Sequence, residues 1–407
     1  MPNIRPFRGV SPSPKYAEKV QISHGVGGDR ENATAEITAN QYSLLHVTNP
    51  ELLLTEEEGS NEDLVRFRSR EKLKEFFEHG ILLKDETDCY YVYRLTLGDH
   101  KQTGLAAAAD IQDYLAGKIK KHELTRVEKV LKQDMLMERF GGYIEPVILS
   151  YDSTGQKHIL FEEWADSHPC FLDFRDRNNI RHQLWVISDE EVNQSISEYF
   201  AGVDSLYICD GHHRIAAGAK FYEDHQTEES RFVLALIFPS EETMILDYNR
   251  AVMDLNGLTE DEFLSALQEK GFSLETLGSE PARPTAEGEY TMLMDGIWYR
   301  LSYNGPRDYS DPVASLDVSI LQDLVIRDIL GISNPQADHR ISFISGTKGL
   351  EGLVAATKKD MKVAFAITPC SMHSIMQVAD AEMSMPPKST CFEPKPVSGV
   401  VMMQTAQ

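Results

Sequence analysis

The chain has 407 residues, more than one ordinary hydrophobic core accommodates, so its length predicts two or three domains. Its formal net charge of −24 argues against a nucleic-acid partner, because phosphate backbones are bound by clustered lysine and arginine side chains. No stretch approaches the roughly 18 unbroken apolar residues of a membrane span, so no membrane partner is expected. The net charge does not exclude a local basic pocket that binds small phosphorylated ligands.

The N-terminus and the cysteines indicate the cellular compartment. Residues 1–8 contain no apolar signal core. The five cysteines are an odd number and lack CxxC spacing, which is typical neither of a disulfide framework nor of a zinc site. We therefore expect a cytoplasmic protein.

The first 100 residues contain two clear periodic segments. Residues 1–60 are rich in turn-forming residues that interrupt any regular pattern. The apolar spacing over residues 62–79 predicts an amphipathic helix, with Gly80 at its C′ position. The aromatic and β-branched run at residues 89–97 predicts a strand.

Two capping boxes predict helices in the next part of the chain. Thr125 and Glu128 have the spacing that opens a helix, which we expect to run to about Phe140. Residues 188–191 have the same form and predict a helix through about Phe200. The shorter elements expected after it are a strand at 206–209, a helix at 215–222, and strands at 232–238 and 244–252.

The chain changes character near residue 255. Residues 259–262 form a third capping box, and Asp295–Gly296 lies between two apolar runs. The Asp-Gly pair predicts a β-hairpin, because it suits the positive φ angles of a type I′ turn. Asp311–Pro312 predicts the start of a long helix that ends before Gly331. A strand at 363–367 and a helix around 371–381 precede a loop-like tail.

The alternation of strands and helices predicts a mixed α/β (α+β) chain. Changes in pattern near residues 86 and 250 divide it into three expected regions. These regions are an N-terminal extension with an amphipathic helix at 1–85, a core at 86–250, and a C-terminal α/β domain at 251–407.

The polar chemistry concentrates in Asp210–Arg214, between the predicted strand at 206–209 and an alanine-rich helix. A strand-to-helix turn directs backbone N–H groups outward and places an anion at the positive end of the helix dipole. That interaction stabilises an anion by about 0.3–1 kcal/mol before side chains contribute. The alternative interpretation is a helix cap with two solvated histidines. The concentration of polar residues directly after a buried strand weighs against it.

Each side chain of this turn suits phosphate chemistry. Gly211 allows a phosphate to approach the backbone, and Arg214 can bind phosphate oxygens bidentately. His212 and His213 can donate hydrogen bonds, and Asp210 can bind a metal ion or accept a hydroxyl proton.

The run Asp-Gly-His-His-Arg after a strand resembles the phosphate loop of the ParB/sulfiredoxin superfamily, especially its free serine kinase branch. That branch transfers phosphate between a nucleotide and free serine, and it pairs the loop with an upstream His-Glu segment carrying a catalytic glutamate. The matching segment here contains His122 and Glu123, followed by Thr125. The resemblance implies a ParB/sulfiredoxin-like catalytic core over residues 86–250.

The resemblance also implies a role for each matched residue. Glu123 would be the general base, since a carboxylate near a serine hydroxyl can take its proton. Asp210 would be the second catalytic residue and would hold Mg²⁺. The residues expected to bind the phosphates of ADP or ATP are Gly211, His212, His213 and Arg214, and His122 and Thr125 are substrate candidates.

Over nearly its whole length the chain also resembles domain-of-unknown-function family 1015. The matching stretches are 4–8, 42–48, 102–105, 246–250 and 385–390. Within the last stretch, two prolines fix the backbone and present Lys388 and Ser389, which we consider as substrate contacts beside the alternative of a rigid tail. The chain departs from the family pattern at His24–Gly28, where the family sequence resembles Pro-Pro-Tyr-Asp-Val, and this leaves substrate identity open.

Together these features predict a phosphotransferase acting on free serine or O-phosphoserine, with a nucleotide as phosphate donor or acceptor. Two alternatives stay open. Water in place of the serine hydroxyl would make the site a phosphoserine phosphatase, and a non-catalytic nucleotide-binding switch would use the loop without turnover. The presence of Glu123 favours an enzyme, since a switch has less need of a base. The expected partner is a small-molecule substrate, and a homodimer stays open.

Overall fold

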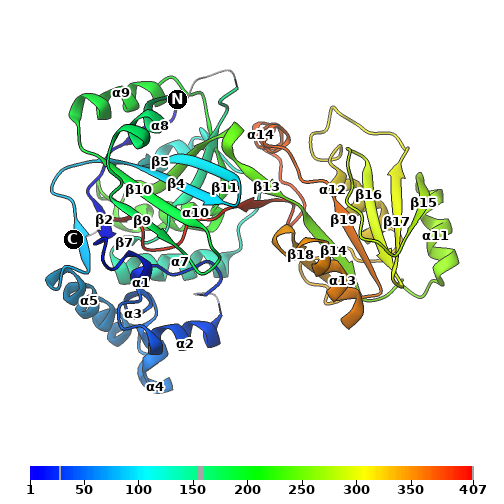
Figure 1. The fold of residues 1–407 in the computed structure, drawn as a ribbon, viewed down its shortest axis with the longest axis horizontal. Helices are drawn as coiled ribbons and strands as arrows, with labels where there is room; N and C mark the ends of the chain where they lie inside the picture. The colour runs from blue at the N-terminus through cyan, green and yellow to red at the C-terminus, as the bar shows by residue number, and fades with distance from the viewer. Residues whose placement is uncertain (27–28, 155–158, 406–407) are drawn as a thin grey trace. The chain divides into compact units, whose positions relative to one another are not determined.

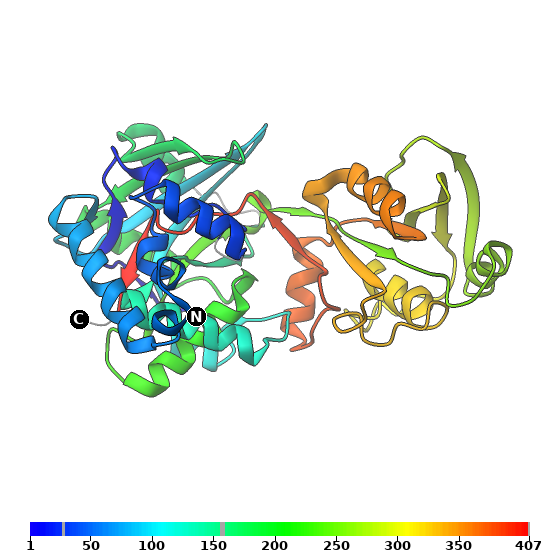
Figure 2. The same ribbon diagram turned by 90° about the horizontal axis from the view of Figure 1, so that it is seen from below.

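The computed structural model of the chain describes residues 1–26, 29–154 and 159–405. Contacts between residues divide the chain into two compact units. Unit 1 contains Met1–Thr243 and Pro394–Gln407, and unit 2 contains Met244–Glu393. The chain therefore begins and ends in unit 1 (Figures 1 and 2). The mixture of helices and strands in both units confirms the predicted α+β class.

The division into three regions at 1–85, 86–250 and 251–407 stays a prediction. Gly27 and Gly28, in the divergent segment His24–Gly28, lie outside the described residues. Within the described ranges, no helix has both the length and the apolar character needed to cross a membrane.

The main sheet of unit 1 has the strand order β6-β11-β8-β12-β5-β4-β10-β9, and β1 pairs with β5. Its strands are β1 Ile4–Arg5, β4 Tyr90–Leu97, β5 His100–Asp110, β6 Ile119–Lys120, β8 Val147–Tyr151, β9 Leu172–Arg175, β10 Arg181–Ile187, β11 Leu206–Asp210 and β12 Phe232–Pro239. β6 runs parallel to β11 and β8 parallel to β12, whereas the other pairs are antiparallel. Every residue of β12 is buried, as its continuous apolar sequence leads one to expect.

A second sheet of unit 1 has the order β3-β2-β21-β7, with β2 Gly9–Pro12, β3 Leu82–Lys84, β7 Gly142–Tyr143 and β21 Met402–Gln404. β21 pairs with β2 and β7, so the end of the chain is a structural part of unit 1. The helices of unit 1 are α1 Ala17–Val20, α2 Arg30–Ala39, α3 Leu45–Thr48, α4 Glu56–Gly59, α5 Glu62–Glu78, α6 Ile111–Leu115, α7 Val127–Phe140, α8 Ile159–Ser167, α9 Glu190–Phe200 and α10 His212–His225, with 3₁₀ turns at Pro50–Leu53 and Ser240–Glu242.

Helices α7 and α10 pack against each other beside the main sheet (Figure 1). The alanine-rich sequence of α10 permits a close approach to its neighbours. A Cβ atom at Gly218 would lie 2.3 Å from the hydroxyl oxygen of Tyr143, so only glycine fits there. This packing fixes the N-terminus of α10 relative to α7, and the candidate site is built on both helices.

The predicted helix at 62–79 is confirmed as α5, and Gly80 follows it with φ +61°. Phe67, one of the apolar residues of this periodic pattern, is 55% exposed, whereas Val65 and Ser69 are buried. The strand at 89–97 is confirmed as β4. α10 begins at His212, three residues before the expected start, because Gly211 turns the chain directly into the helix.

Two predicted helix caps of unit 1 are wrong by one residue. α7 begins after Arg126 rather than Thr125, and no side chain caps it. The backbone N–H of Arg126 donates to Nε2 of His213 at 3.1 Å. α9 is capped by the side chain of Asp189, which accepts from the backbone N–H of Val192. Both helices nevertheless form where they were expected.

Unit 2 contains an antiparallel sheet with the order β15-β17-β16-β19-β14-β18 and a separate pair β13-β20. Its strands are β13 Met244–Leu246, β14 Tyr248–Val252, β15 Phe272–Gly278, β16 Glu289–Met294, β17 Ile297–Tyr303, β18 Ile341–Ser345, β19 Val363–Ile367 and β20 Cys391–Glu393. Its helices are α11 Glu260–Glu269, α12 Asp317–Ile320, α13 Gly349–Lys359 and α14 Met372–Asp380, with a π-helical turn at Leu321–Arg327 and a 3₁₀ turn at Gly346–Lys348.

The local signals in unit 2 are confirmed where they are strongest. Asp295 and Gly296 have φ angles of +49° and +80°, as a type I′ hairpin turn between β16 and β17 requires. Thr259 and Glu262 form the predicted capping box of α11. The strand at 363–367 and the helix around 371–381 are also present, as β19 and α14.

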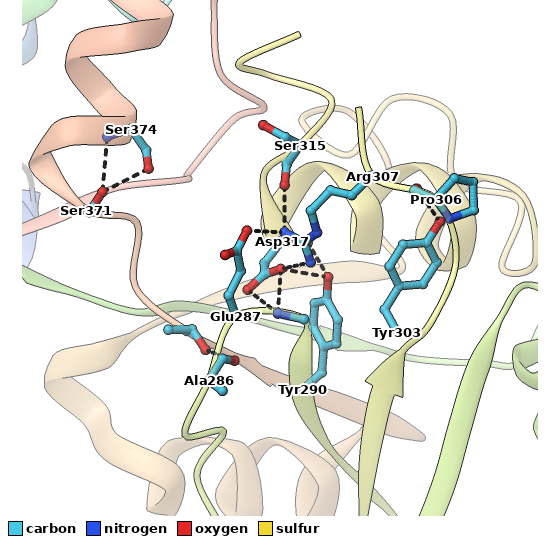
Figure 3. A network of polar contacts seen from close by, with 12 residues as sticks. Ala286, Glu287, Tyr290, Tyr303, Pro306, Arg307, Ser315, Asp317, Ser371 and Ser374 are labelled. Atoms are coloured by element: carbon cyan, nitrogen blue, oxygen red, sulfur yellow. Dashed lines mark hydrogen bonds and ion pairs between the residues drawn. The ribbon is translucent and has the colours of Figure 1, made fainter. Parts of the chain in front are cut away.

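The predicted start of the long helix at Asp311–Pro312 is wrong, whereas a helical stretch that ends before Gly331 is present as α12 and the π-helical turn at Leu321–Arg327. The Asp311 carboxylate accepts from the N–H groups of Val313 and Ala314, which closes a local turn instead of opening a helix. The helix begins six residues later at Asp317, whose carboxylate is held at 2.7 Å by Arg307 (Figure 3). The N–H of Gly288 also donates to this carboxylate, so contacts distant in sequence determine where the helix starts.

Candidate functional site

The candidate site is built at the turn between β11 and α10. Asp210 ends the strand, Gly211 has φ +94°, and α10 begins at His212. A side chain at Gly211 would be strained in this left-handed conformation, and its Cβ would lie 2.9 Å from Nε of Arg214. The turn therefore requires glycine and places the positive end of the α10 dipole at its surface.

A pocket of about 450 Å³ opens over this turn, entirely within unit 1. Six separate parts of the chain form its walls: the turn itself, one face of α7, the segment before α2, the end of α3, the residues after β7, and the segment that returns from unit 2. The lining residues are Ile22, Ser23, His24, Gly25, Thr48, Asn49, Lys129, Lys132, Gln133, Leu136, Ile144, Glu145, Asp210, Gly211, His213, Arg214, Pro396 and Ser398.

Asp210 lies between two cations. Arg214 donates from Nη2 to Oδ2 of Asp210, and Nζ of Lys395 donates to Oδ1 at 3.0 Å. Burial alone would raise the pKa of the Asp210 carboxyl, but the charges of Lys395 and Arg214 outweigh burial and hold the pKa well below its usual range. Asp210 is therefore a carboxylate that orients two cations at the pocket.

Arg214 is held in place on several sides. Its guanidinium donates to the carbonyl oxygen of Pro146, and Nη1 lies 3.1 Å from the Glu145 carboxylate. Only 8% of the residue is exposed, and it lines the pocket. Because these contacts fix the guanidinium beside Gly211, an anion in the pocket meets a preorganised cation.

The α7 wall of the pocket adds two lysines. Lys129, Lys132, Gln133 and Leu136 are three, four and seven residues apart and therefore share one face of the helix. The lysines and Arg214 outnumber the two carboxylates of the lining, Asp210 and Glu145, in a chain whose net charge is −24.

The segment that contains Glu123 is attached to the turn. The backbone N–H of His122 donates to Nε2 of His212 at 3.5 Å, and that of Arg126 donates to Nε2 of His213 at 3.1 Å. The rings of His122 and His212 also meet edge to face, with centroids 4.6 Å apart. Glu123 is half-buried and lies between these two contacts, in a segment that is held beside the turn.

The structure brings some of the predicted residues into the pocket and leaves others outside it. Asp210, Gly211, His213 and Arg214 line the pocket. Within the described part of the chain, His122 and His212 do not line the pocket, and they are only 2% and 4% exposed. A phosphate contact of His212 would therefore come from its backbone N–H. Thr125 is exposed at the start of α7.

Lys388 and Ser389 belong to unit 2. Ser389 is buried and donates to the carbonyl oxygen of Pro386 at 2.6 Å, whereas Lys388 is exposed, with φ +59°. The buried Arg250 donates to the carbonyl oxygens of Pro387 and Lys388, so the stretches 246–250 and 385–390 are joined. A role of Lys388 or Ser389 in substrate binding stays a prediction.

Sequence reasoning missed the three lysines of this site. Lys129 and Lys132 follow the His-Glu segment at helical spacing, and this pattern provides a signal that could have found them. Lys395 lies 185 residues from Asp210 in sequence, and no local pattern connects them.

Asp210, the predicted Mg²⁺ ligand, forms ion pairs with two side chains of the protein. Arg214 donates to one oxygen of Asp210 and Lys395 to the other, so both oxygens already have a cationic partner. In the part of the chain that the structure describes, no three His, Cys, Asp or Glu side chains group as metal ligands would. The residues therefore do not fit a protein-enclosed metal site.

The fold and the pocket define an α+β protein with a pocket over a strand-to-helix turn. The sequence matches the protein family of unknown function DUF1015 over residues 4–319, so the chain belongs to this family. This match confirms the resemblance to family 1015 that the sequence motifs indicated. No curated protein matches the chain.

Several solved structures are similar to the chain at low identity and low TM-score. A free serine kinase in complex with AMP is 12% identical, with a TM-score of 0.38, covering 74% of this chain and 91% of that chain. A variant of free serine kinase in complex with ADP is 14% identical, with a TM-score of 0.37, covering 74% and 92%. A conserved hypothetical protein from Pyrococcus furiosus is 11% identical, with a TM-score of 0.35, covering 73% and 93%. The family assignment rests on the sequence match and not on these structures.

Proposed function

We propose that the chain is a phosphotransferase that moves a phosphoryl group between a nucleotide and the hydroxyl of free serine. The observation that carries the proposal is the pocket over Gly211, where a helix N-terminus and Arg214 meet the two lysines of α7. Such a concentration of donors and positive charge in an acidic protein suits a polyphosphate.

The proposed binding mode follows from the positions of these groups. The backbone N–H groups at the start of α10 and the guanidinium of Arg214 bind the inner phosphates. Lys129 and Lys132 neutralise the remaining charge, since both face the same pocket. The pocket volume of about 450 Å³ lies within the range of about 300–1,000 Å³ that is common for small-molecule sites.

The proposed chemistry needs a base for the serine hydroxyl. Glu123 is the candidate, because its segment is attached to the turn and because a carboxylate can take the proton as the new P–O bond forms. The resemblance of residues 122–123 and 210–214 to the free serine kinase motifs supports this assignment. We propose that any Mg²⁺ arrives with the nucleotide phosphates, since Asp210 is engaged by two cations.

Phosphorus NMR with Mg²⁺, O-phospho-L-serine and ADP tests the proposal, beside a control without ADP. New ATP in the full mixture is the expected result. Glu123→Gln should lower this turnover by about 100- to 10,000-fold, to a residual rate that can still be measured, while ADP binding, measured by calorimetry, is retained. Glu128→Gln is the matched control, because Glu128 is a nearby exposed glutamate that pairs with Arg126.

The other outcomes separate the alternatives. Free phosphate both with and without ADP would replace the kinase by a phosphoserine phosphatase. ADP binding with an unchanged spectrum would reject serine as the acceptor and favour a nucleotide-binding switch.

A further inference from the structure

The two histidine rings of the Asp210–Arg214 turn contact protein backbone. Each ring presents Nε2 as an acceptor, His212 to the N–H of His122 and His213 to the N–H of Arg126. These two anchor points lie on either side of Glu123. The segment begins at β6, which pairs in parallel with β11 through Leu206 and Tyr207.

The hydrogen-bond pattern defines the state of both rings. An imidazole that accepts at Nε2 is neutral and carries its proton on Nδ1. Burial lowers the pKa of both His212 and His213, which favours this neutral form. A charged ring would lose the acceptor, so the contacts require neutral rings.

The anchored segment lies outside the regular elements of unit 1. After β6 ends at Lys120, residues 121–126 belong to neither a helix nor a strand, and Leu124 is 71% exposed. Holding such a segment in one conformation costs about 1–2 kcal/mol per residue in backbone entropy. Arg126 is the N-cap of α7 without a side-chain cap, so the His213 contact joins the end of the segment to the turn.

We infer that His212 and His213 are positioning residues, whose rings hold Glu123 beside the phosphate-binding turn. The inference rests on the proposed function in taking Glu123 as the base. It divides the turn into two roles: the backbone and Arg214 bind the anion, and the two histidines place the base. A displacement of about 1 Å can cost about 100-fold in rate, so the anchors affect turnover more than binding.

The first test compares His213→Leu with His213→Gln, because a Gln side chain can again present an acceptor near the position of Nε2. We expect His213→Leu to lower kcat by about 10- to 100-fold while the KM for ADP changes less than about twofold. His213→Gln should restore most of the activity. His225→Leu, at the far end of the same helix, is the control and should behave like the wild type.

A double variant tests whether His213 acts through Glu123. If it does, His213→Leu should lower the residual rate no further once Glu123→Gln is present. A full additional loss in that background would overturn the inference. So would a His213→Leu variant whose ADP affinity falls tenfold or more while kcat is unchanged, since His213 would then be a phosphate ligand.

Amide hydrogen exchange separates this inference from the proposed function. Exchange over residues 122–126 should be faster in His213→Leu than in the wild type and unchanged in His225→Leu. This readout needs no turnover, so it holds even if the wild type transfers no phosphate. Unchanged exchange in His213→Leu would show that the ring does not anchor the segment.

Discussion

His122 should make unit 1 sensitive to acid. The residue is 2% exposed, and burial lowers the pKa of its imidazole to about 4, although contact with the Ile208 backbone and the charge of Asp210 act in the opposite direction. The ring of His212, which packs against it, is also buried. A proton on His122 would therefore be placed where the fold opposes a charge.

The sign and size of the effect follow from proton linkage. Above about pH 6.5 the ring is neutral in both the folded and the unfolded chain, and it has no effect. Between about pH 6.5 and 4 the unfolded chain binds a proton that the folded chain does not, so the free energy of unfolding falls by about 1.4 kcal/mol per pH unit. His122 should thus remove about 3 kcal/mol by pH 4, and nothing further below it.

Urea unfolding followed by tryptophan fluorescence measures this loss. Trp164 and Trp185 lie in unit 1 and Trp298 in unit 2, so a Trp298→Phe background reports unit 1 alone. Between pH 7 and pH 4, the free energy of unfolding should fall by about 3 kcal/mol less in the variant His122→Phe than in its parent. His79→Leu, at an exposed position, should keep the slope of the parent. Parallel curves for the parent and His122→Phe would refute the reasoning.

Three further substitutions test other contacts. Gly211→Ala should destabilise unit 1 by about 1–3 kcal/mol in urea, because φ is +94° there, and an unchanged midpoint would contradict that strain. Lys395→Met should weaken ADP binding by calorimetry about tenfold, whereas equal affinity would place Lys395 outside the ligand site. Arg307→Met should cost unit 2 about 3–5 kcal/mol by leaving the Asp317 carboxylate, whose side chain is 9% exposed, without its cation, whereas Arg327→Met, in an exposed pair, should cost less than about 1 kcal/mol.

The elements that the sequence predicted correctly are determined by local interactions. α5 has apolar periodicity and a terminal glycine, and the Asp295–Gly296 turn has φ angles that few other pairs adopt. The capping box of α11 lies within four residues. In each case the stabilising contacts are close in sequence, so a short window contains the information.

β5 shows why other elements could not be predicted. It is an 11-residue strand near the centre of the main sheet, yet it contains Ala106–Ala109, which by propensity favours a helix. Its small residues suit a crowded position: a Cβ at Gly104 would lie 2.7 Å from the ring of Phe238 on the neighbouring strand β12. The surrounding sheet decides the conformation, and a single sequence does not show that surrounding.

The start of α7 shows the same limit at the candidate site. Thr125 and Glu128 have the spacing of a capping box, but the helix starts one residue later because the N–H of Arg126 donates to His213, 87 residues away. The local signal indicated that a helix begins there. The long-range contact decided where, and it is this contact that attaches the Glu123 segment to the turn.

Lys395 makes the contact of the site that is most distant in sequence among those described above. It follows unit 2 in the chain by two residues, and it reaches Asp210 because the returning segment is held in unit 1, where Gln102 donates to the carbonyl oxygen of Pro394 and β21 pairs with β2. Motif reasoning placed the site within residues 86–250, which contains the turn, the α7 lysines and Glu123. One of the two cations on Asp210 and part of the pocket wall come from beyond residue 390, so an isolated 86–250 fragment would lack them. The Asp210–Arg214 turn is a local motif, whereas the charge balance around Asp210 depends on the return of the chain to unit 1.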